Sequence, residues 1–134
     1  MNFESRLTEI TTPAIVHGEL LSVQESLDLH APDQGGIEFQ TDQPGKRHGW
    51  HSHDVTERLI ILEGSMMLEW RDGEKGKNQL VEAGDVIDLP ANTVHQSTTG
   101  TSVCRYLIRP EGGAAAHTTV HSARTRSEPR MCGH

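Results

Sequence analysis

The sequence predicts a small all-β protein with one domain. A chain of 134 residues suits a single domain and leaves little room for two. Short runs of apolar and β-branched residues recur along the chain, and Gly, Pro, Asn and Asp separate them. Helical periodicity is weak throughout. Many short strands at regular spacing are typical of a β-sandwich or a β-barrel.

Seven segments have the composition and length of strands. They are residues 14–23, 36–40, 59–62, 65–70, 78–82, 86–89 and 102–109. The stretch 71–77 is charged and contains glycine, so we expect an exposed hairpin turn there.

Three regions are expected along the chain. Residues 1–35 are interpreted as an N-terminal strand or arm that packs on the barrel or on a dimer partner, and residues 36–110 as the barrel core. From Glu111 onward the chain is rich in small and polar residues and has almost no large apolar side chains. Because such a segment buries too little apolar surface to order itself, residues 111–134 are predicted to be a flexible tail, with His117 and His121 solvated.

The composition argues against several classes of function. The formal net charge is −7, which does not favour a nucleic-acid partner. The chain has neither a basic run that would bind a membrane surface nor an apolar run long enough to span a bilayer. Residues 1–6 lack the apolar core of a signal peptide, and two cysteines do not make a disulfide framework. A cytoplasmic location is therefore expected.

The strongest signal for function is a cluster of histidines in the middle of the chain. Side chains two apart on an extended strand point to the same face, so His51 and His53 share a face, and the alternation extends to Glu57. Two imidazoles and a carboxylate suit a divalent metal, and His95 is the best candidate for a third imidazole from another strand. The same parity predicts that His48 faces away from His51, on the surface or the rim.

These residues resemble the two motifs of the cupin family, G-x5-H-x-H-x3-E-x6-G and G-x5-P-x-G-x2-H-x3-N. The first motif is matched in full by Gly45, His51, His53, Glu57 and Gly64. The second is matched by Gly84, Pro90 and His95. The sequence departs from it at Asn92, where the motif has Gly, and at Thr99, where it has Asn. The first departure is mild, because Asn tolerates a left-handed backbone better than most residues.

The resemblance implies a cupin jelly-roll β-barrel and one metal ion per chain. The implied ligands are His51, His53, Glu57 and His95, and two further coordination positions would stay open. The metal would be a divalent transition ion: Fe, Mn, Ni, Co, Cu or Zn. Oxygenase, lyase and isomerase reactions on a small polar organic molecule are the expected activities, with a dioxygenase slightly favoured. Glu57 is either a ligand or a base, and a non-catalytic sensor or a structural cupin is the alternative.

Alternation also predicts which side chains line the pocket. Extending the pattern from Glu57 points Leu59 and Ile61 inward, and the more apolar face of residues 65–70 is expected to do the same. Two registers remain open for residues 102–109. In the favoured one, Tyr106 faces the pocket and donates a hydrogen bond or acts as an acid. In the other, Arg105 faces the pocket and indicates an anionic substrate.

The apolar residues of the N-terminal segment predict an oligomer. Sheet edges need cover, and this segment could supply it across a two-fold axis. We therefore expect a homodimer.

Overall fold

The computed structural model describes residues 12–121, and most of them lie in β-strands that form two antiparallel five-stranded sheets. The elements of the first sheet, in spatial order, are β1 (Ala14–His17), β7 (Asp85–Leu89), β4 (Glu57–Glu63), β9 (Cys104–Pro110) and β2 (Glu38–Asp42). Those of the second are β10 (Thr118–Val120), β3 (Arg47–His53), β8 (His95–Thr99), β5 (Ser65–Asp72) and β6 (Lys75–Glu82). The expected all-β jelly roll with a single domain is confirmed.

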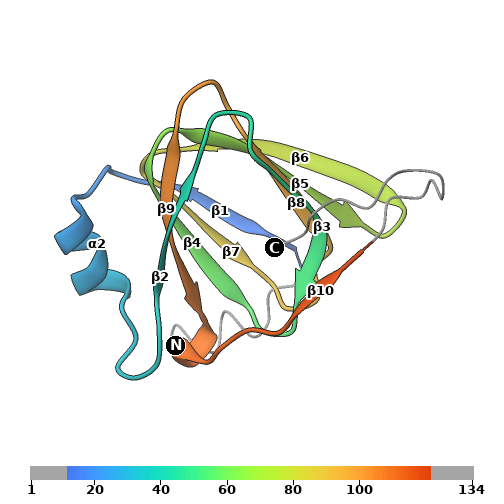
Figure 1. Ribbon diagram of the computed structural model, residues 1–134. Coiled ribbons are helices and arrows are strands. Elements are labelled where there is room, and N and C mark those ends of the chain that lie inside the picture. The colour runs from blue at the N-terminus through green and yellow to red at the C-terminus, as the bar shows by residue number, and fades with distance from the viewer. Residues whose placement is uncertain (1–11, 122–134) are drawn as a thin grey trace.

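The two sheets face each other and enclose the apolar core, as the view along the barrel shows (Figure 1). Leu59 and Ile61 of β4 are buried in this core, as the alternation predicts. Met66 and Leu68 of β5 are also buried, whereas Met67 between them is exposed on the outer face. The alternation of strand side chains therefore determines which residues reach the interior.

Two turns of the motif have the backbone conformation that their residues favour. Asn92 has a φ of 67°, which agrees with the tolerance of Asn for the left-handed region. Gly64 has a φ of 80° and lies directly against the carbonyl oxygen of Val103, where a Cβ atom would not fit.

The N-terminal segment differs from the single strand predicted for residues 14–23. It forms the short strand β1, which pairs with β7 of the same chain, and then the helix α2 (Val23–His30). Ser22 caps this helix: its side chain accepts from the backbone N–H of Glu25, and the Glu25 carboxylate accepts from that of Ser22. This capping box is visible in the sequence as Ser-x-x-Glu and would have revealed the helix.

The C-terminal segment follows the barrel as far as residue 121, in contrast to the expected flexible tail. A 3₁₀ turn (Glu111–Gly113) is followed by β10, which pairs with β3. Two backbone-anchored bonds fix its start: the N–H of His117 donates to the Asp54 carboxylate at 2.8 Å, and that of Asp54 donates to the His117 carbonyl at 3.1 Å. Main-chain hydrogen bonds hold this segment without large apolar side chains. The rest of the predicted tail lies outside the described residues.

Candidate metal centre

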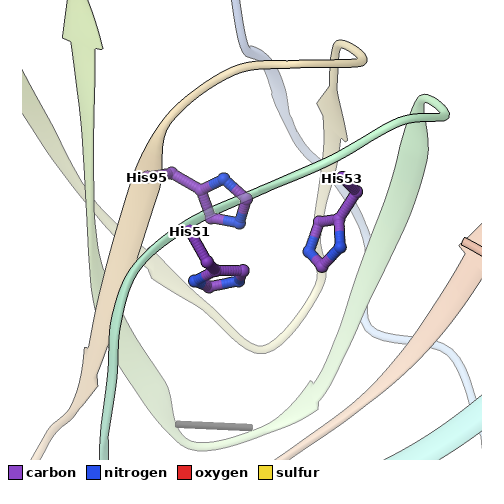
Figure 2. A group of neighbouring side chains, drawn as sticks. All are labelled: His51, His53 and His95. Carbon is purple, nitrogen blue, oxygen red and sulfur yellow. The ribbon is translucent and has the colours of Figure 1, made fainter. Parts of the chain in front are cut away.

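Three imidazoles meet inside the barrel. His51 and His53 come from β3 and His95 from β8, and one ring nitrogen of each lies within 4.8 Å of the other two. Figure 2 shows the three rings gathered around a common space. The ring centroids of His51 and His95 are 4.3 Å apart, because these two residues pair directly across the strands. Imidazole nitrogens this close suit one divalent transition metal ion.

The Nδ1 atom of each of these histidines has an oxygen partner. His51 Nδ1 lies 2.5 Å from the carbonyl oxygen of Gly49, and His95 Nδ1 lies 2.8 Å from that of Thr93. His53 Nδ1 lies 3.0 Å from Thr118 Oγ1. Because a carbonyl can only accept, Nδ1 of His51 and His95 carries the proton and Nε2 carries the lone pair. Such outer partners orient metal-binding histidines, so the donor set fits a metal ion.

The surroundings keep two of the three imidazoles, those of His53 and His95, neutral. Burial lowers the pKa of His95 to about 3, with a further contribution from the charge of His51. Burial, together with the charge of His51, also lowers the pKa of His53 to about 4. Both side chains are therefore neutral near pH 7, which is the form of histidine that binds metals.

Glu57 lies beside this cluster and is almost completely buried. Its Oε1 atom is 3.4 Å from His53 Nε2, but the carboxylate is not part of the group of three within 4.8 Å. Burial, followed by the charge of Glu38, raises the pKa of Glu57 to about 7. The predicted carboxylate thus reaches the cavity next to the imidazoles, and its role as a ligand stays a prediction.

His48 lines the same cavity, which corrects the expectation that it faces away from His51. His48 pairs with Ser97 and His51 pairs with His95. Between these two pairs, β3 advances by three positions while β8 advances by two. The extra residue is a β-bulge, and it reverses the alternation between the two histidines. Their side chains therefore reach the same interior, together with Ser97.

A second polar cluster surrounds Asp42, which the sequence did not indicate. Asp42 is 2% exposed, and its carboxylate accepts from Gln40 Nε2 at 3.0 Å and from the Tyr106 hydroxyl at 2.8 Å. His48 Nε2 lies 2.9 Å from both carboxylate oxygens. Burial alone would raise the pKa of Asp42, but the hydrogen bonds from these three side chains outweigh it and lower the pKa.

The structure selects between the two registers of residues 102–109. Tyr106 is buried and lines the cavity, whereas the Arg105 guanidinium lies outside and pairs with Glu63 at 2.7 Å. The Tyr106 hydroxyl donates its hydrogen bond to the Asp42 carboxylate. Burial, with the adjacent Asp42 charge, also raises the pKa of Tyr106 above its usual range.

The cavity that joins the two clusters has a volume of about 430 Å³. Apolar side chains from both sheets form much of its wall, among them Leu59, Leu68 and Ile108. Residues 113–116 and Thr118 form another part of the wall, so the C-terminal segment helps to enclose the site. A volume of this size accommodates a small organic molecule.

Comparisons with known proteins agree with this architecture. Residues 38–108 match the model of the cupin domain, so the chain belongs to the cupin family. No curated protein sequence matches the chain. None of the helices in residues 12–121 is long and apolar enough to cross a membrane.

Solved structures with the same fold have diverse functions. Pumpkin seed globulin is 14% identical, with a TM-score of 0.58 over 63% of this chain and 22% of its own. The chain thus spans about a fifth of that globulin. The QdtA 3,4-ketoisomerase from Thermoanaerobacterium thermosaccharolyticum is 16% identical, with a TM-score of 0.58 over 76% of this chain and 81% of its own. A structure from a study of the DMSP lyases RdDddP and RnDddQII is 24% identical, with a TM-score of 0.57 over 64% of this chain and 43% of its own. At these identities the likeness shows the fold alone.

Proposed function

We propose that this cupin is a metal-dependent enzyme that acts on a small polar organic molecule. One observation carries the proposal: three imidazoles converge at the wall of a cavity large enough for a small substrate. A metal that only stabilised the fold would be enclosed by protein ligands, whereas an ion beside a cavity keeps positions for other molecules.

Each ligand has its part in this proposal. His51, His53 and His95 hold the ion through Nε2, and Glu57 supplies the fourth ligand, which its short distance to His53 supports. A divalent ion bound there would polarise a substrate oxygen and stabilise the negative charge that develops on it. Apolar side chains in the cavity wall lower the local dielectric, which strengthens such electrostatic effects.

Two reaction classes fit this site. A dioxygenase is the first, because imidazole and carboxylate ligands suit Fe and Cu, which react with oxygen. A lyase or isomerase is the second, and the hydrogen-bonded group of Asp42, His48 and Tyr106 favours it, because these reactions need proton transfer. Two of the similar structures concern a ketoisomerase and lyases, which is in keeping with the second class.

The test begins with the metal. The purified chain is stripped with a chelator, reloaded separately with Fe²⁺, Mn²⁺, Ni²⁺, Co²⁺, Cu²⁺ or Zn²⁺, and supplied with diketones, flavonols, thiols and hydroxy acids. Oxygen consumption with one of these compounds supports a dioxygenase, and product formation without oxygen supports a lyase or isomerase. A chain that binds the metal but converts none of them with any metal is better described as a sensor.

We also propose a homodimer. Strand β1 covers the edge of β7 within the same chain. Phe39, on β2 at the opposite edge of that sheet, is 52% exposed. An apolar side chain at an open sheet edge favours pairing with a second copy. Light scattering at micromolar concentration is expected to give twice the mass of the chain, and a monomer mass would contradict this.

A further inference from the structure

The pair Asp42 and His48 is a second polar centre, separate from the three-histidine cluster, and His48 is the member of the pair that lines the cavity. The side chains are 2% and 12% exposed, and His48 Nε2 lies 2.9 Å from both carboxylate oxygens. Tyr106 and Gln40 donate to the same carboxylate, so three side chains hold it in place. Burial with this many hydrogen bonds fixes the geometry of the pair.

The charge of Asp42 determines which nitrogen of His48 carries the proton. The three hydrogen bonds outweigh the effect of burial and lower the pKa of Asp42, so it is a carboxylate near pH 7. A carboxylate only accepts hydrogen bonds, so Nε2 of His48 carries the proton and Nδ1 carries the lone pair. An imidazole whose N–H is held by a carboxylate is well suited to accept a proton, because the carboxylate stabilises the imidazolium that forms.

The charges around the cavity indicate the kind of molecule that enters it. None of the described residues that line the cavity is Lys or Arg, but two of them, Glu38 and Glu57, are acidic. A substrate that carries several negative charges in solution would meet these carboxylates, and the proposed divalent ion would be the one cation beside this described lining to offset them. A neutral molecule is therefore favoured, and it acquires negative charge only when it loses a proton inside the cavity.

We propose that Asp42 and His48 form the proton-transfer pair for a neutral, enolisable carbonyl compound that binds the metal through oxygen. The C–H or O–H bond of the substrate breaks, an N–H bond forms at His48 Nδ1, and the electron pair stays on the substrate as an enolate. Asp42 stabilises the resulting imidazolium, and Tyr106 positions Asp42. No oxidant or reductant takes part in this step.

The spacing within β3 is compatible with this role. His48 precedes His51 by three residues, which is at most about 10 Å along an extended strand. Because the bulge between them turns both side chains toward the same interior, one small molecule can contact both centres. The inference rests on the proposed function, because it requires a metal that binds the substrate oxygen.

The first experiment examines the pair without metal. In the ¹⁵N NMR spectrum of the metal-free chain at pH 7, His48 is expected to show a proton on Nε2 and none on Nδ1. The Asp42→Asn variant removes the anionic acceptor, and we expect this preference to be lost. A His48 resonance with the proton on Nδ1 in the wild-type chain would overturn the proposal.

The second experiment measures proton transfer with acetylacetone, a neutral diketone that binds metals as its enolate. Stopped-flow absorbance follows enolate formation on the Zn²⁺-loaded chain. We expect His48→Gln to slow it by about 100-fold, which is typical of the loss of a general base. His17→Gln is the matched control, because His17 also pairs with an aspartate, Asp85 at 2.8 Å, but is 63% exposed and not among the residues that line the cavity.

The outcomes separate this inference from the proposed function. Equal zinc content in all variants, with slow enolate formation only in His48→Gln, supports the pair. A His48→Gln rate within twofold of wild type overturns the pair and leaves the metal-dependent function standing. Failure of acetylacetone to form an enolate on the wild-type zinc-loaded chain overturns the inference, whereas the metal-dependent function is then decided by the flavonols, thiols and hydroxy acids of the panel. Recovery of the rate in His48→Ala on addition of imidazole would show that the missing base, rather than a folding defect, causes the loss.

Discussion

The two ends of the cavity hold their histidines in different ways. At one end, neutral oxygen atoms contact Nδ1: carbonyl groups for His51 and His95, and the Thr118 hydroxyl for His53. At the other end, the acceptor for His48 is the buried carboxylate of Asp42, and the contact is through Nε2. Histidines at one cavity therefore have partners of two kinds, neutral oxygen atoms and a carboxylate.

The difference lies in the charge of the acceptor. A neutral acceptor orients the imidazole without stabilising its protonated form, so the ring stays a neutral ligand with its lone pair on the opposite nitrogen. An anionic acceptor stabilises the imidazolium and favours proton transfer. The local partner, more than the residue type, thus separates the histidines expected to bind metal from the one expected to move a proton.

The largest effect is expected from removing one imidazole of the metal cluster. His53→Ala should lower the metal content of the purified chain by more than tenfold, because one ligand and its Thr118-supported orientation are lost. Elemental analysis after equilibration with equimolar Zn²⁺ measures this, and His17→Gln is the control. Unchanged metal stoichiometry in His53→Ala would rule out His53 as a ligand.

The next effect concerns the carboxylate at the other end. Asp42→Asn should lower the free energy of unfolding by about 2 kcal/mol at pH 7, since hydrogen bonds to a buried charge are lost. The folded-state pKa of Asp42 is lowered, so its stabilising contribution is complete above about pH 4 and disappears as the pH falls through the lowered pKa.

Urea denaturation at pH 7 and at successively lower pH measures this difference. The gap between wild type and Asp42→Asn should narrow as the solution is acidified below about pH 4. A gap that stays constant over this range would show that the Asp42 charge does not contribute to stability.

A smaller effect is expected from the outer partner of His53. Thr118→Val removes the hydroxyl next to Nδ1 while keeping the shape of the side chain, and should weaken Zn²⁺ binding by about tenfold. Competition with a chromogenic chelator gives the dissociation constant. Thr119→Val is the matched control, because Thr119 lies on the same strand opposite Ser52. Equal weakening in both variants would point to a general effect on β10.

The smallest effect is expected from Tyr106→Phe. Asp42 loses one of its donors but keeps Gln40 and His48, so the free energy of unfolding should fall by about 1 kcal/mol. The affinity for Zn²⁺ should stay within twofold of wild type, because the donors of the metal cluster are unchanged. A large loss of zinc affinity would mean that the two ends of the cavity are coupled.

The sequence predicted the three-histidine cluster because its signals are local. His51 and His53 are two residues apart on a strand, and the turn before His95 has the motif spacing. The inward faces of β4 and β5 followed from alternation and from the more apolar face, whereas alternation left two registers open for β9. Such features depend on a period of two, which a sequence displays directly.

The features that sequence reasoning missed arise from contacts between distant residues. Asp42 meets Tyr106 across 64 positions of the chain, and no pattern in either segment indicates it. The bulge before His51 is a property of the pairing between β3 and β8. Strict alternation along β3 therefore placed His48 on the wrong face. β10 is ordered by backbone pairing with β3, which composition does not report.

The most direct test of the central claim is X-ray absorption spectroscopy of the chain loaded with one equivalent of Co²⁺. Three imidazole ligands are expected, with the remaining ligands oxygen, and one imidazole should be lost in His95→Ala. A wild-type spectrum with one imidazole or none would contradict the assignment of His51, His53 and His95 as the metal centre.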